Sequence, residues 1–581
     1  MKTTPAIFCF LFVIGTGIKT TAKAQAVNVQ DSLALVDLYN STNGPSWINH
    51  SNWLTGPAKT WYGITLSANR VTEIYFSNNK LNGIIPSSLG NLTKLTSLTL
   101  YSNQLSGSIP ASLGDLINLN SLNLSMNQLS ESIPSSLENL VNLSSLYLYS
   151  NQLSGNIPVS LGNLINLSSL FLNDNELSGN IPPSFGKLVN LESLLLYNNQ
   201  LSGSIPSSLG NLVNLDFLSL YNNQLSGGIP SSLGNLINLT ALWLNDNQLS
   251  GNIPASLGNL VNLTLLYLSD NQLSGSIPAS LSNLTFLRYL RLNSNQLNSS
   301  IPSYIGDLLY LDELVLNNNQ LSGGIPSSLG NLSRLHYLYL DNNKLSGSIP
   351  SSLGNLPRLF YLDLDSNNFS GDVSVIANIP LLRKVSLSGN LFIFNGMELI
   401  AQKFHNAKYN DQAYIPIHQN GSALSVSAGG TLSNNTYGWY MVGQTDTTFI
   451  TGDSIFYPVQ NGRYRVKIRN AVATKLTLKS QPIDYVAPPV LNNTFIASSE
   501  SALQQHDKAT VFLVYPNPAK DMLHIQTQGK VTIQLSDQSG KILITKTING
   551  NGEINVSQLA AGLYYLKNKN TGETQKIIVT K

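Results

Sequence analysis

The chain has 581 residues with 32 basic and 30 acidic side chains, and charged residues make up 11% of it, against about 25% in an ordinary soluble domain. A hydrophobic share of 42% provides material for an extended core, which excludes a wholly disordered chain. The near-zero balance excludes the concentrated Lys and Arg surface that nucleic-acid binding requires, so no nucleic-acid partner is expected. The net charge is −9 in residues 71–382 and +8 in residues 383–581, so an acidic middle precedes a basic end.

Residues 1–26 read as a secretory signal peptide. Lys2 gives a positive start, Ile7–Ile14 is an apolar run too short to span a bilayer, and small residues near Ala24 supply a cleavage site. Cys9, the single cysteine, lies inside this segment, so the mature chain is expected to have no disulfide. A lipid-anchored cysteine is the alternative, although Cys9 lies within the apolar run. No later stretch reaches about 18 apolar residues, so no transmembrane segment is expected in the mature chain.

Residues 71–358 consist of twelve consecutive units of 24 residues. A representative unit, residues 95–118, reads LTSLTLYSNQLSGSIPASLGDLIN. We number positions within each unit from its first leucine, so that Leu95 is position one. Two degenerate units follow, and the pattern ends near Phe404. One unit cannot bury its leucines alone, whereas a stack of about fourteen units can.

Each recurring residue of the unit has a physical reason. Leu98 and Leu100 alternate with polar residues, which predicts a short strand with its leucines pointing inward. Asn103, at position nine, recurs in the other units, and its amide is expected to bond backbone groups of stacked units in a buried ladder. Gly107 permits a turn that most residues disfavour, and Pro110 stands where no backbone donor is needed.

The motif L-x-x-L-x-L-x-x-N-x-L-S-G-x-I-P resembles the leucine-rich repeats of plant-type receptors and inhibitors. The resemblance implies a mainly β right-handed solenoid over residues 71–408, with a parallel sheet on its concave side and short 3-10 segments. Residues 27–70 resemble the N-terminal cap of such arrays, without the family's cysteine pair, so aromatic packing of Trp47, Trp53 and Trp61 is expected to hold the cap. Glu131 and Ser299 replace the turn glycine, which suggests local strain, a small contact feature or a change without consequence.

Positions three, five and seven of each unit alternate with core leucines and are expected to face solvent on the concave side. They are rich in tyrosine, serine and asparagine, a composition similar to that of antibody paratopes. Drift among duplicated repeats is the alternative explanation. We predict a ligand-binding surface formed by the following residues: Tyr147, Tyr149, Phe171, Tyr197, Phe217, Tyr221, Trp243, Tyr267, Tyr289, Arg291, Glu313, Tyr337, Tyr339, Tyr361 and Asp363. The chemically mixed stretch from Tyr289 to Asp365 is the preferred hot spot.

Two β-rich segments follow the repeats. Residues 415–485 carry alternating strands, a tryptophan in Trp439-Tyr440 and a late tyrosine, Tyr464, and they resemble immunoglobulin-like β-sandwiches. Residues 486–509, with Pro488-Pro489 and a polar run, read as a linker.

Residues 510–581 resemble the C-terminal sorting domain of the type IX, or Por, secretion system, and a β-sandwich is expected there. The motifs that carry the resemblance are YPNPA at residues 515–519, LAAGLYYLK at 559–567 and the basic chain end. The predicted sorting-signal residues are Pro516, Asn517, Pro518, Gly562, Tyr564 and Lys581. The resemblance implies recognition by the type IX machinery and secretion or display on the outer surface of a bacterium. A generic terminal β-sandwich is the alternative.

Catalytic motifs are missing from the sequence. The six histidines are scattered, and we find no phosphate loop, nucleophile elbow, metal-ligand spacing or cofactor motif. We therefore expect a non-enzymatic recognition protein without cofactor or metal that binds an extracellular protein or polysaccharide. An inhibitor of a secreted hydrolase and a passive surface-layer or adhesive spacer are the alternatives.

Overall fold

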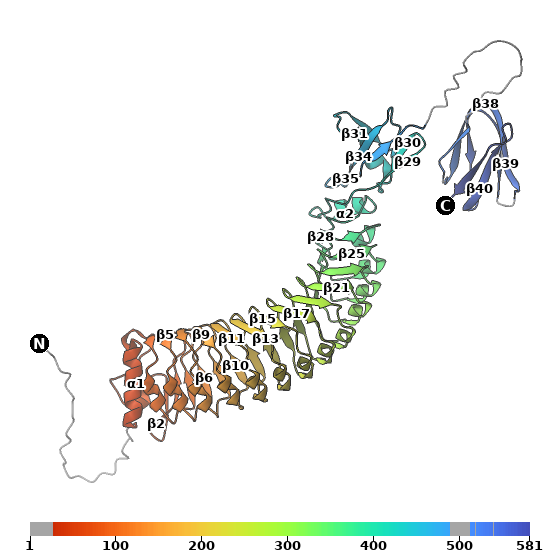
Figure 1. The fold of residues 1–581 in the computed structure, drawn as a ribbon. Coiled ribbons are helices and arrows are strands. Elements are labelled where there is room, and N and C mark those ends of the chain that lie inside the picture. The colour runs from red at the N-terminus through yellow and green to blue at the C-terminus, as the bar shows by residue number, and fades with distance from the viewer. Residues whose placement is uncertain (1–26, 489–511, 518, 538–539, 581) are drawn as a thin grey trace, which may run out of the picture. The chain divides into compact units, whose positions relative to one another are not determined.

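The computed structural model describes residues 27–488, 512–517, 519–537 and 540–580 (Figure 1). The predicted signal peptide with Cys9, the predicted linker from residue 489 onward, Pro518 and Lys581 lie outside these residues. The chain divides into two compact units, residues 1–489 and 490–581, which we describe separately.

The repeats form a solenoid with two parallel sheets, as the 24-residue period predicts. We call the longer one the long sheet. It is formed by the first strand of each unit, which the sequence analysis predicted to lie on the concave side. Its 15 strands stack in chain order, parallel from β2 onward, with position four of each unit opposite position four of the next, as in Leu98 and Leu122. Its strands are β1 (Ile64–Ser67), β2 (Arg70–Tyr75), β4 (Ser97–Thr99), β6 (Ser121–Asn123), β8 (Ser145–Tyr147), β10 (Ser169–Phe171), β12 (Ser193–Leu195), β14 (Phe217–Ser219), β16 (Ala241–Trp243), β18 (Leu265–Tyr267), β20 (Tyr289–Arg291), β22 (Glu313–Val315), β24 (Tyr337–Tyr339), β26 (Tyr361–Asp363) and β28 (Lys384–Ser386).

The second sheet comes from positions 10 to 14 of the units, on the other side of the leucine core. Its strands are β3 (Asn82–Ile84), β5 (Gln104–Ser108), β7 (Gln128–Glu131), β9 (Gln152–Asn156), β11 (Glu176–Asn180), β13 (Gln200–Ser204), β15 (Gln224–Gly227), β17 (Gln248–Asn252), β19 (Gln272–Gly275), β21 (Gln296–Ser300), β23 (Gln320–Gly323), β25 (Lys344–Gly347) and β27 (Asn368–Phe369). A 3-10 turn follows in each unit, from η3 (Ser87–Asn91) to η15 (Ser374–Asn378).

The position-nine asparagines form the predicted buried ladder. In Asn223 the side-chain Nδ2 donates to the carbonyl oxygens of Leu196 and Leu220, both at 3.1 Å, and Oδ1 accepts the backbone N–H of Leu201 at 3.0 Å. The same bonds recur from Asn103 to Asn390, and Gln412 makes the equivalent bonds after the last unit. Each unit is thereby bonded to the preceding one through groups that would otherwise be buried without partners.

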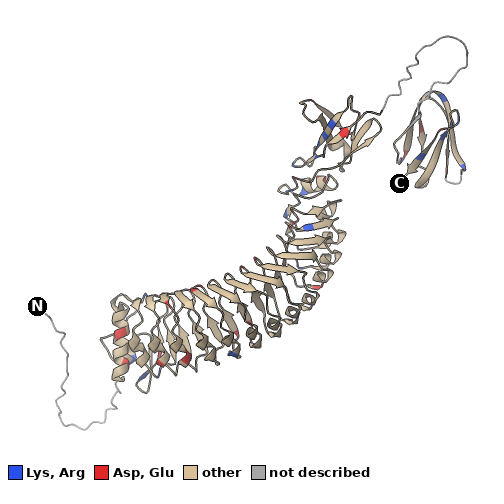
Figure 2. Ribbon diagram, in the orientation of Figure 1, with Lys and Arg blue, Asp and Glu red and all other residues tan. Residues whose placement is uncertain are grey.

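Two further ladders, which the sequence analysis did not predict, join the outer edges of the units. The position-24 asparagines from Asn118 to Asn262 donate to a carbonyl of the preceding unit at 2.7–3.0 Å. A serine at position 18 does the same on the 3-10 turns, as Ser208 does to Pro183 at 2.7 Å. Uncharged amides and hydroxyls therefore replace ion pairs along the array, which Figure 2 shows mostly free of charged residues.

Position 13, which lies within most second-sheet strands or ends them, has a left-handed backbone, and glycine occupies it in most units. Glu131 and Ser299, which stand in for that glycine, have φ values of 66° and 84°. The strain predicted at these two departures is therefore present. A side chain at Gly203 would place Cβ 2.4 Å from the Asn180 Oδ1, so the preceding coil also limits substitution there.

The cap begins with α1 (Val29–Ser41) and includes the turns η1 (Gly44–Ser46) and η2 (Ala58–Thr60). Trp47, Trp53 and Trp61 form a chain of ring contacts with centroid separations of 5.0 and 4.5 Å, which confirms the predicted aromatic packing. The structure adds an ion pair, because Arg70 donates two bonds of 2.9 Å to the carboxylate of Asp31, which is fully buried.

After α2 (Met397–Lys403), residues 417–485 form two antiparallel sheets whose core is continuous with that of the array. The strands of one are β29 (Ile417–Asn420), β30 (Ala423–Val426) and β33 (Ile455–Phe456), and those of the other are β31 (Asn435–Met441), β32 (Thr447–Thr451), β34 (Gly462–Asn470), β35 (Thr477–Lys479) and β36 (Ile483–Tyr485). Buried Trp439 stacks on Phe456 across the sheets at 5.2 Å, and the Tyr464 hydroxyl donates to the Gln460 carbonyl, a bond typical of immunoglobulin-like folds.

The C-terminal unit is one antiparallel sheet of β37 (Phe512–Tyr515), β38 (Met522–Ser536), β39 (Ile542–Asn555), β40 (Gly562–Asn568) and β41 (Thr574–Val579). The first half of β38 pairs with β37, its second half pairs with β40, and an irregularity separates the halves. Ala519 bridges to Val579 at the end of β41, so the sheet nearly closes around its own apolar core.

Candidate functional site

The predicted binding residues all lie on strands of the long sheet or directly after them, on the side away from the leucine core. We call this surface the long-sheet face. Residues at the same position of successive units pair in register, as Ser219 does with Trp243 and Trp243 with Tyr267, so each position forms a continuous row. Most of these side chains are half-buried, and Phe217 and Tyr337 are 38% and 40% exposed.

Aromatic rings along these rows contact their neighbours in adjacent units. Tyr197 and Tyr221 are stacked, with centroids 4.5 Å apart and planes 8° from parallel. Tyr147 and Phe171 lie 4.9 Å apart, and Tyr339 and Tyr361 lie 4.8 Å apart. Such contacts fix the rings before any ligand arrives, which lowers the entropic cost of binding. Burial, followed by the charge of Asp174, raises the pKa of Tyr197 to about 12, so its hydroxyl stays protonated.

The C-terminal stretch of the face, which the sequence favoured as a hot spot, is internally paired. Arg291 forms a bidentate pair with Glu313 at 2.8 and 3.2 Å and lies 4.7 Å from the ring centre of Tyr267. The Tyr361 hydroxyl donates to Asp363 at 2.9 Å, and burial with that bond raises the pKa of Tyr361. These polar groups already satisfy one another, so a ligand would have to contact the pairs from outside.

Beside this stretch, sequence reasoning missed a charged cluster on position two of the units. Asp312 is buried, Arg288 donates to it at 2.7 Å, and Arg334 and His336 lie 4.0 and 3.7 Å from its other oxygen. An alignment of the repeat units at position two would have revealed the cluster, because Arg288, Asp312 and His336 occupy that position in three consecutive units.

Carboxylates gather at the end of the face. Burial and the neighbouring charge of Asp363 raise the pKa of Asp365 to about 6, and the same two causes raise the pKa of Asp341. The Ser388 backbone N–H, which donates to Asp365 at 2.6 Å, opposes the shift without cancelling it.

Four of the predicted sorting-signal residues can be placed, while Pro518 and Lys581 lie outside the described residues. Asn517 is held by β41, because its Nδ2 donates to the Lys576 carbonyl and its Oδ1 accepts the Ile578 N–H. Gly562 begins β40, and the Tyr564 hydroxyl donates to the Ala560 carbonyl at 2.8 Å. Pro516 directly follows β37. The two motifs therefore help to join the strands of the terminal sheet.

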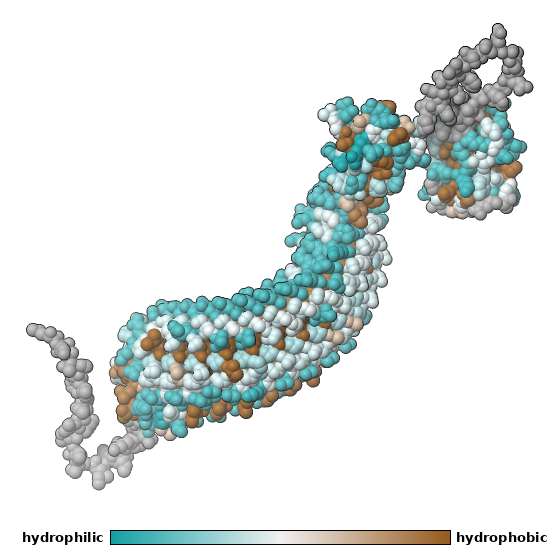
Figure 3. Space-filling view, in the orientation of Figure 1, coloured by the Kyte–Doolittle hydropathy of each residue, from teal (hydrophilic) through white to brown (hydrophobic). Residues whose placement is uncertain are grey.

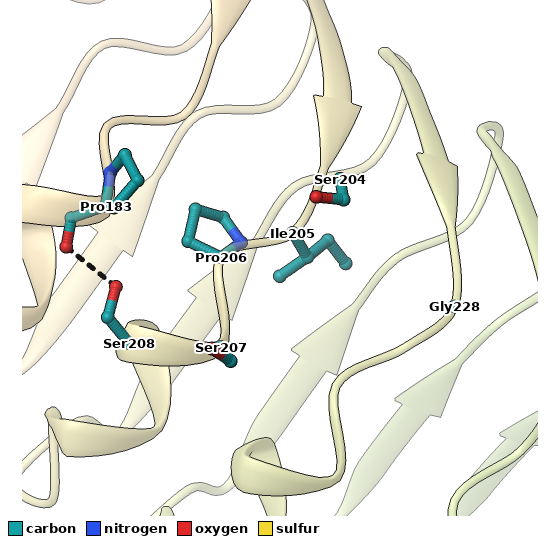
Figure 4. Close-up of a pocket in the computed structure, with 7 residues that line it drawn as sticks. All are labelled: Pro183, Ser204, Ile205, Pro206, Ser207, Ser208 and Gly228. Carbon is teal, nitrogen blue, oxygen red and sulfur yellow. Dashed lines mark hydrogen bonds between the residues drawn. The ribbon is translucent and has the colours of Figure 1, made fainter.

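Two hollows of the described surface have no catalytic arrangement of side chains. A hollow of about 460 Å³ beside the second sheet is lined by serines, prolines, Ile205 and Gly228, without a titratable side chain (Figure 4). Another of about 310 Å³ in the sandwich contains one histidine, His418. Among the described residues no group of His, Cys, Asp and Glu has the arrangement of a metal site. In the same part of the chain, no helix has the length and apolar character needed to cross a bilayer.

Comparison with family models identifies three regions of the chain. The Leucine Rich Repeat model matches eight successive units between residues 70 and 260, and the Leucine-rich repeat region model matches residues 266–388. The Secretion system C-terminal sorting domain matches residues 513–580, which indicates type IX secretion with release or surface attachment. No catalytic family was found, and a search of curated proteins gave no significant match.

Solved structures of plant receptors resemble the array. The PEPR1–AtPEP1 complex is 33% identical, with 66% of this chain and 58% of that chain covered and a TM-score of 0.59. The ectodomain of GASSHO1/SCHENGEN3 from Arabidopsis thaliana is 33% identical over 65% and 53%, with a TM-score of 0.51. The Arabidopsis HAESA ectodomain is 34% identical over 67% and 70%, with a TM-score of 0.54. The chain spans 53–64% of the length of the first three structures. With its repeats, sheets and asparagine ladder, the chain belongs to the leucine-rich repeat proteins and carries a Por-type C-terminal sorting domain.

Proposed function

We propose that this protein is a secreted or surface-displayed, non-enzymatic recognition protein that binds an extracellular protein or glycan on its long-sheet face. The observation that carries the proposal is the face itself. Aromatic residues, serines and asparagines line up in register over more than ten units, with rings held against each other and few charges. Rigid aromatic contact area with adaptable hydrogen-bonding groups is typical of recognition surfaces.

The comparisons support this proposal in outline. The GASSHO1/SCHENGEN3 and HAESA structures are receptor ectodomains in complex with another molecule, in the second case a peptide hormone ligand. The present chain covers only part of several of these receptors. We therefore propose that it binds a ligand, but we do not assign the receptors' own ligands to it. The sorting domain places the array where an extracellular ligand would meet it.

The experiment that tests the proposal is a binding screen of the purified mature chain on arrays of proteins and glycans. A variant with Phe171→Ala, Trp243→Ala and Tyr337→Ala removes rings from three separate parts of the face. We expect saturable binding that falls at least tenfold in this variant. The matched control is Phe286→Ala, which removes a ring that is 53% exposed at the outer edge of the units.

Two results would contradict the proposal. Absence of saturable binding would favour a passive spacer. Binding that survives the triple substitution would place the binding site elsewhere on the chain. Capture and inhibition of a secreted hydrolase through the same face would identify the protein ligand as an enzyme.

A further inference from the structure

The middle of the long-sheet face contains most of the face's polar atoms that are buried and have no hydrogen-bond partner. These atoms are the Oδ1 of Asn173, the Oγ of Ser219, the Nε1 of Trp243 and the Oδ1 of Asn245, and the Oδ1 of Asp216 lies beside them at position two of its unit. Asn173 is 3% exposed and Ser219 is fully buried. Another such atom on the face, the Oδ1 of Asn317, lies three units beyond Asn245. We call the region that contains the first four, from Asn173 to Tyr267, the central stretch.

The arrangement of the central stretch is orderly. The position-seven row reads Asn173, Tyr197, Tyr221, Asn245, so the stacked tyrosine pair lies between two asparagines. Each asparagine donates its Nδ2 to the aspartate that follows it, at 2.6 Å in both cases. These bonds fix the amides with the same atom, Oδ1, left unpaired on both sides of the tyrosine stack.

The position-five row supplies the other two unpaired atoms. Ser219 lies between Leu195 and Trp243 in this row, and the ring centre of Trp243 is 6.4 Å from that of Tyr267. A buried polar atom without a partner destabilises the folded state, so each of these atoms gains when solvent or a bound molecule supplies the missing bond. Four of them lie beside half-buried aromatic rings, so a ligand that shifts these rings would supply the missing bonds.

The chemistry of these atoms restricts the ligand. Two are acceptors, one is a donor and the serine hydroxyl can be either. A hydroxyl both donates and accepts, whereas an ammonium or guanidinium only donates. The nearest cation of the face, Arg291, is paired with Glu313, and the aspartates next to the asparagines repel anions. The stretch therefore has no free cation for a phosphate, a uronate or a peptide carboxylate.

We propose that the central stretch is a subsite for an uncharged polysaccharide. Sugar rings would cover the tyrosine stack and Trp243 with their C–H faces, which the negative face of an aromatic ring attracts. Because these atoms are closed to solvent in the free protein, the sugar hydroxyls would bond Asn173, Ser219, Trp243 and Asn245 only as the neighbouring side chains shift on binding. Five units at a strand spacing of about 4.8 Å give the stretch a length of roughly 20 Å, enough for several sugar rings. This inference rests on the proposed function and names the class of ligand for the same face.

The tryptophans provide a specific readout. Trp47, Trp53, Trp61 and Trp439 are at most 7% exposed, and Trp243 is the half-buried one. The full mature chain is screened on an array of neutral glycans, acidic glycans and peptides, and hits are titrated by tryptophan fluorescence. We expect at least one neutral glycan to bind saturably with a fluorescence change that Trp243→Phe abolishes, and no acidic glycan to bind more tightly.

Ser219→Ala separates a binding role from a structural one. Because its hydroxyl is unpaired in the protein, the substitution should leave the Tm unchanged or raised while weakening glycan binding threefold to tenfold. The joint substitution of Tyr337, Tyr339 and Tyr361 by alanine should weaken binding less than Trp243→Ala does, and Phe286→Ala should leave it unchanged.

The possible failures are distinguishable. If peptides bind through Trp243 and Ser219 while neutral glycans do not, the glycan inference is wrong and the proposed function stands. If a neutral glycan binds with full affinity to Trp243→Ala and Ser219→Ala, the central stretch is not the subsite. If no ligand depends on any residue of the long-sheet face, the proposed function fails together with the inference.

Discussion

At the scale of single residues, a few uncharged side chains repeated in every unit stabilise the array. A position-nine asparagine such as Asn223 is bonded both to its own unit and to the preceding one. Its amide provides donors and an acceptor at a bend where the backbone cannot pair with itself. The sequence predicted this role because the residue recurs every 24 positions beside core leucines, where an unpaired amide would be costly.

Asn223→Ala should lower the free energy of unfolding by about 2–3 kcal/mol, because it leaves backbone groups of Leu196, Leu201 and Leu220 buried without partners. Urea denaturation of the mature chain, followed by circular dichroism, measures the change. Gln224→Ala is the control, since Gln224 is exposed and next in the chain. Equal effects of the two substitutions would contradict the stabilising role of the ladder.

Asp365 should make stability depend on pH. Its pKa is raised to about 6 from an ordinary value near 3.8, mainly by burial and then by Asp363. A carboxyl group whose folded-state pKa is raised favours the folded state when protonated, so stability should fall as the pH rises from about 4 to about 6. Because Asp365 is only partly buried, we expect a loss of about 1–2 kcal/mol.

Asp365→Asn tests this expectation. The variant should be more stable than the wild type at pH 7 and should lose most of the pH dependence between pH 4 and 6. The Tm measured across that range gives both values. Asp270→Asn, at an exposed position, should follow the wild-type curve, and a parallel curve for Asp365→Asn would show that another group is responsible.

At the scale of elements, the sequence predicts which side chains share a face of the long sheet but not which of them contact each other. Strand alternation alone assigns positions three, five and seven to one face, so the sequence could predict which side chains share a surface. It could not predict which of them pair. The Arg291–Glu313 pair and the stacked Tyr197–Tyr221 pair depend on side-chain conformations, which the neighbouring units determine.

The ion pair of the cap, between fully buried Asp31 and partly exposed Arg70, leads to a prediction about α1. Asp31→Asn should destabilise the chain by about 2–3 kcal/mol, because it removes the charge that Arg70 pairs with and weakens the bonds to Arg70 and to the Val71 N–H. Thermal unfolding of the mature chain measures this loss. Asp37→Asn, on the exposed side of the same helix, should shift the Tm by less than about 2 °C. Equal shifts would mean that the aromatic cluster alone holds the cap.

At the scale of the whole molecule, the chain combines a leucine-rich solenoid with a C-terminal sorting domain for secretion. Apolar patches recur along the array in Figure 3. Seven successive units carry an exposed valine or isoleucine at position 23, with exposures of 45–54% from Ile117 to Val261. Rows of uncharged polar residues adjoin these side chains, which is consistent with solubility at a charged content of 11%.

Removal of residues 510–581 should stop export at the periplasm, because the matched sorting domain occupies this segment. Cell fractionation with an antibody against the array measures the distribution. The variant with Phe171→Ala, Trp243→Ala and Tyr337→Ala is the control and should be exported like the wild type. Normal surface display of the truncated chain would contradict the assignment of the sorting segment.

The sequence alone predicted the architecture, because its 24-residue period of leucine, asparagine, glycine and proline resembles the leucine-rich repeat pattern over most of the array. The sequence also predicted type IX secretion, because the motifs of the sorting domain consist of consecutive residues and can be recognised without a structure. The tertiary structure decided what periodicity cannot encode. The Asp31–Arg70 pair joins residues 39 apart, and the edge ladders depend on the distance between coils. The unpaired atoms around Ser219 and Trp243 appear only when neighbouring side chains close over them, because burial is a property of the packed surface and not of the repeat.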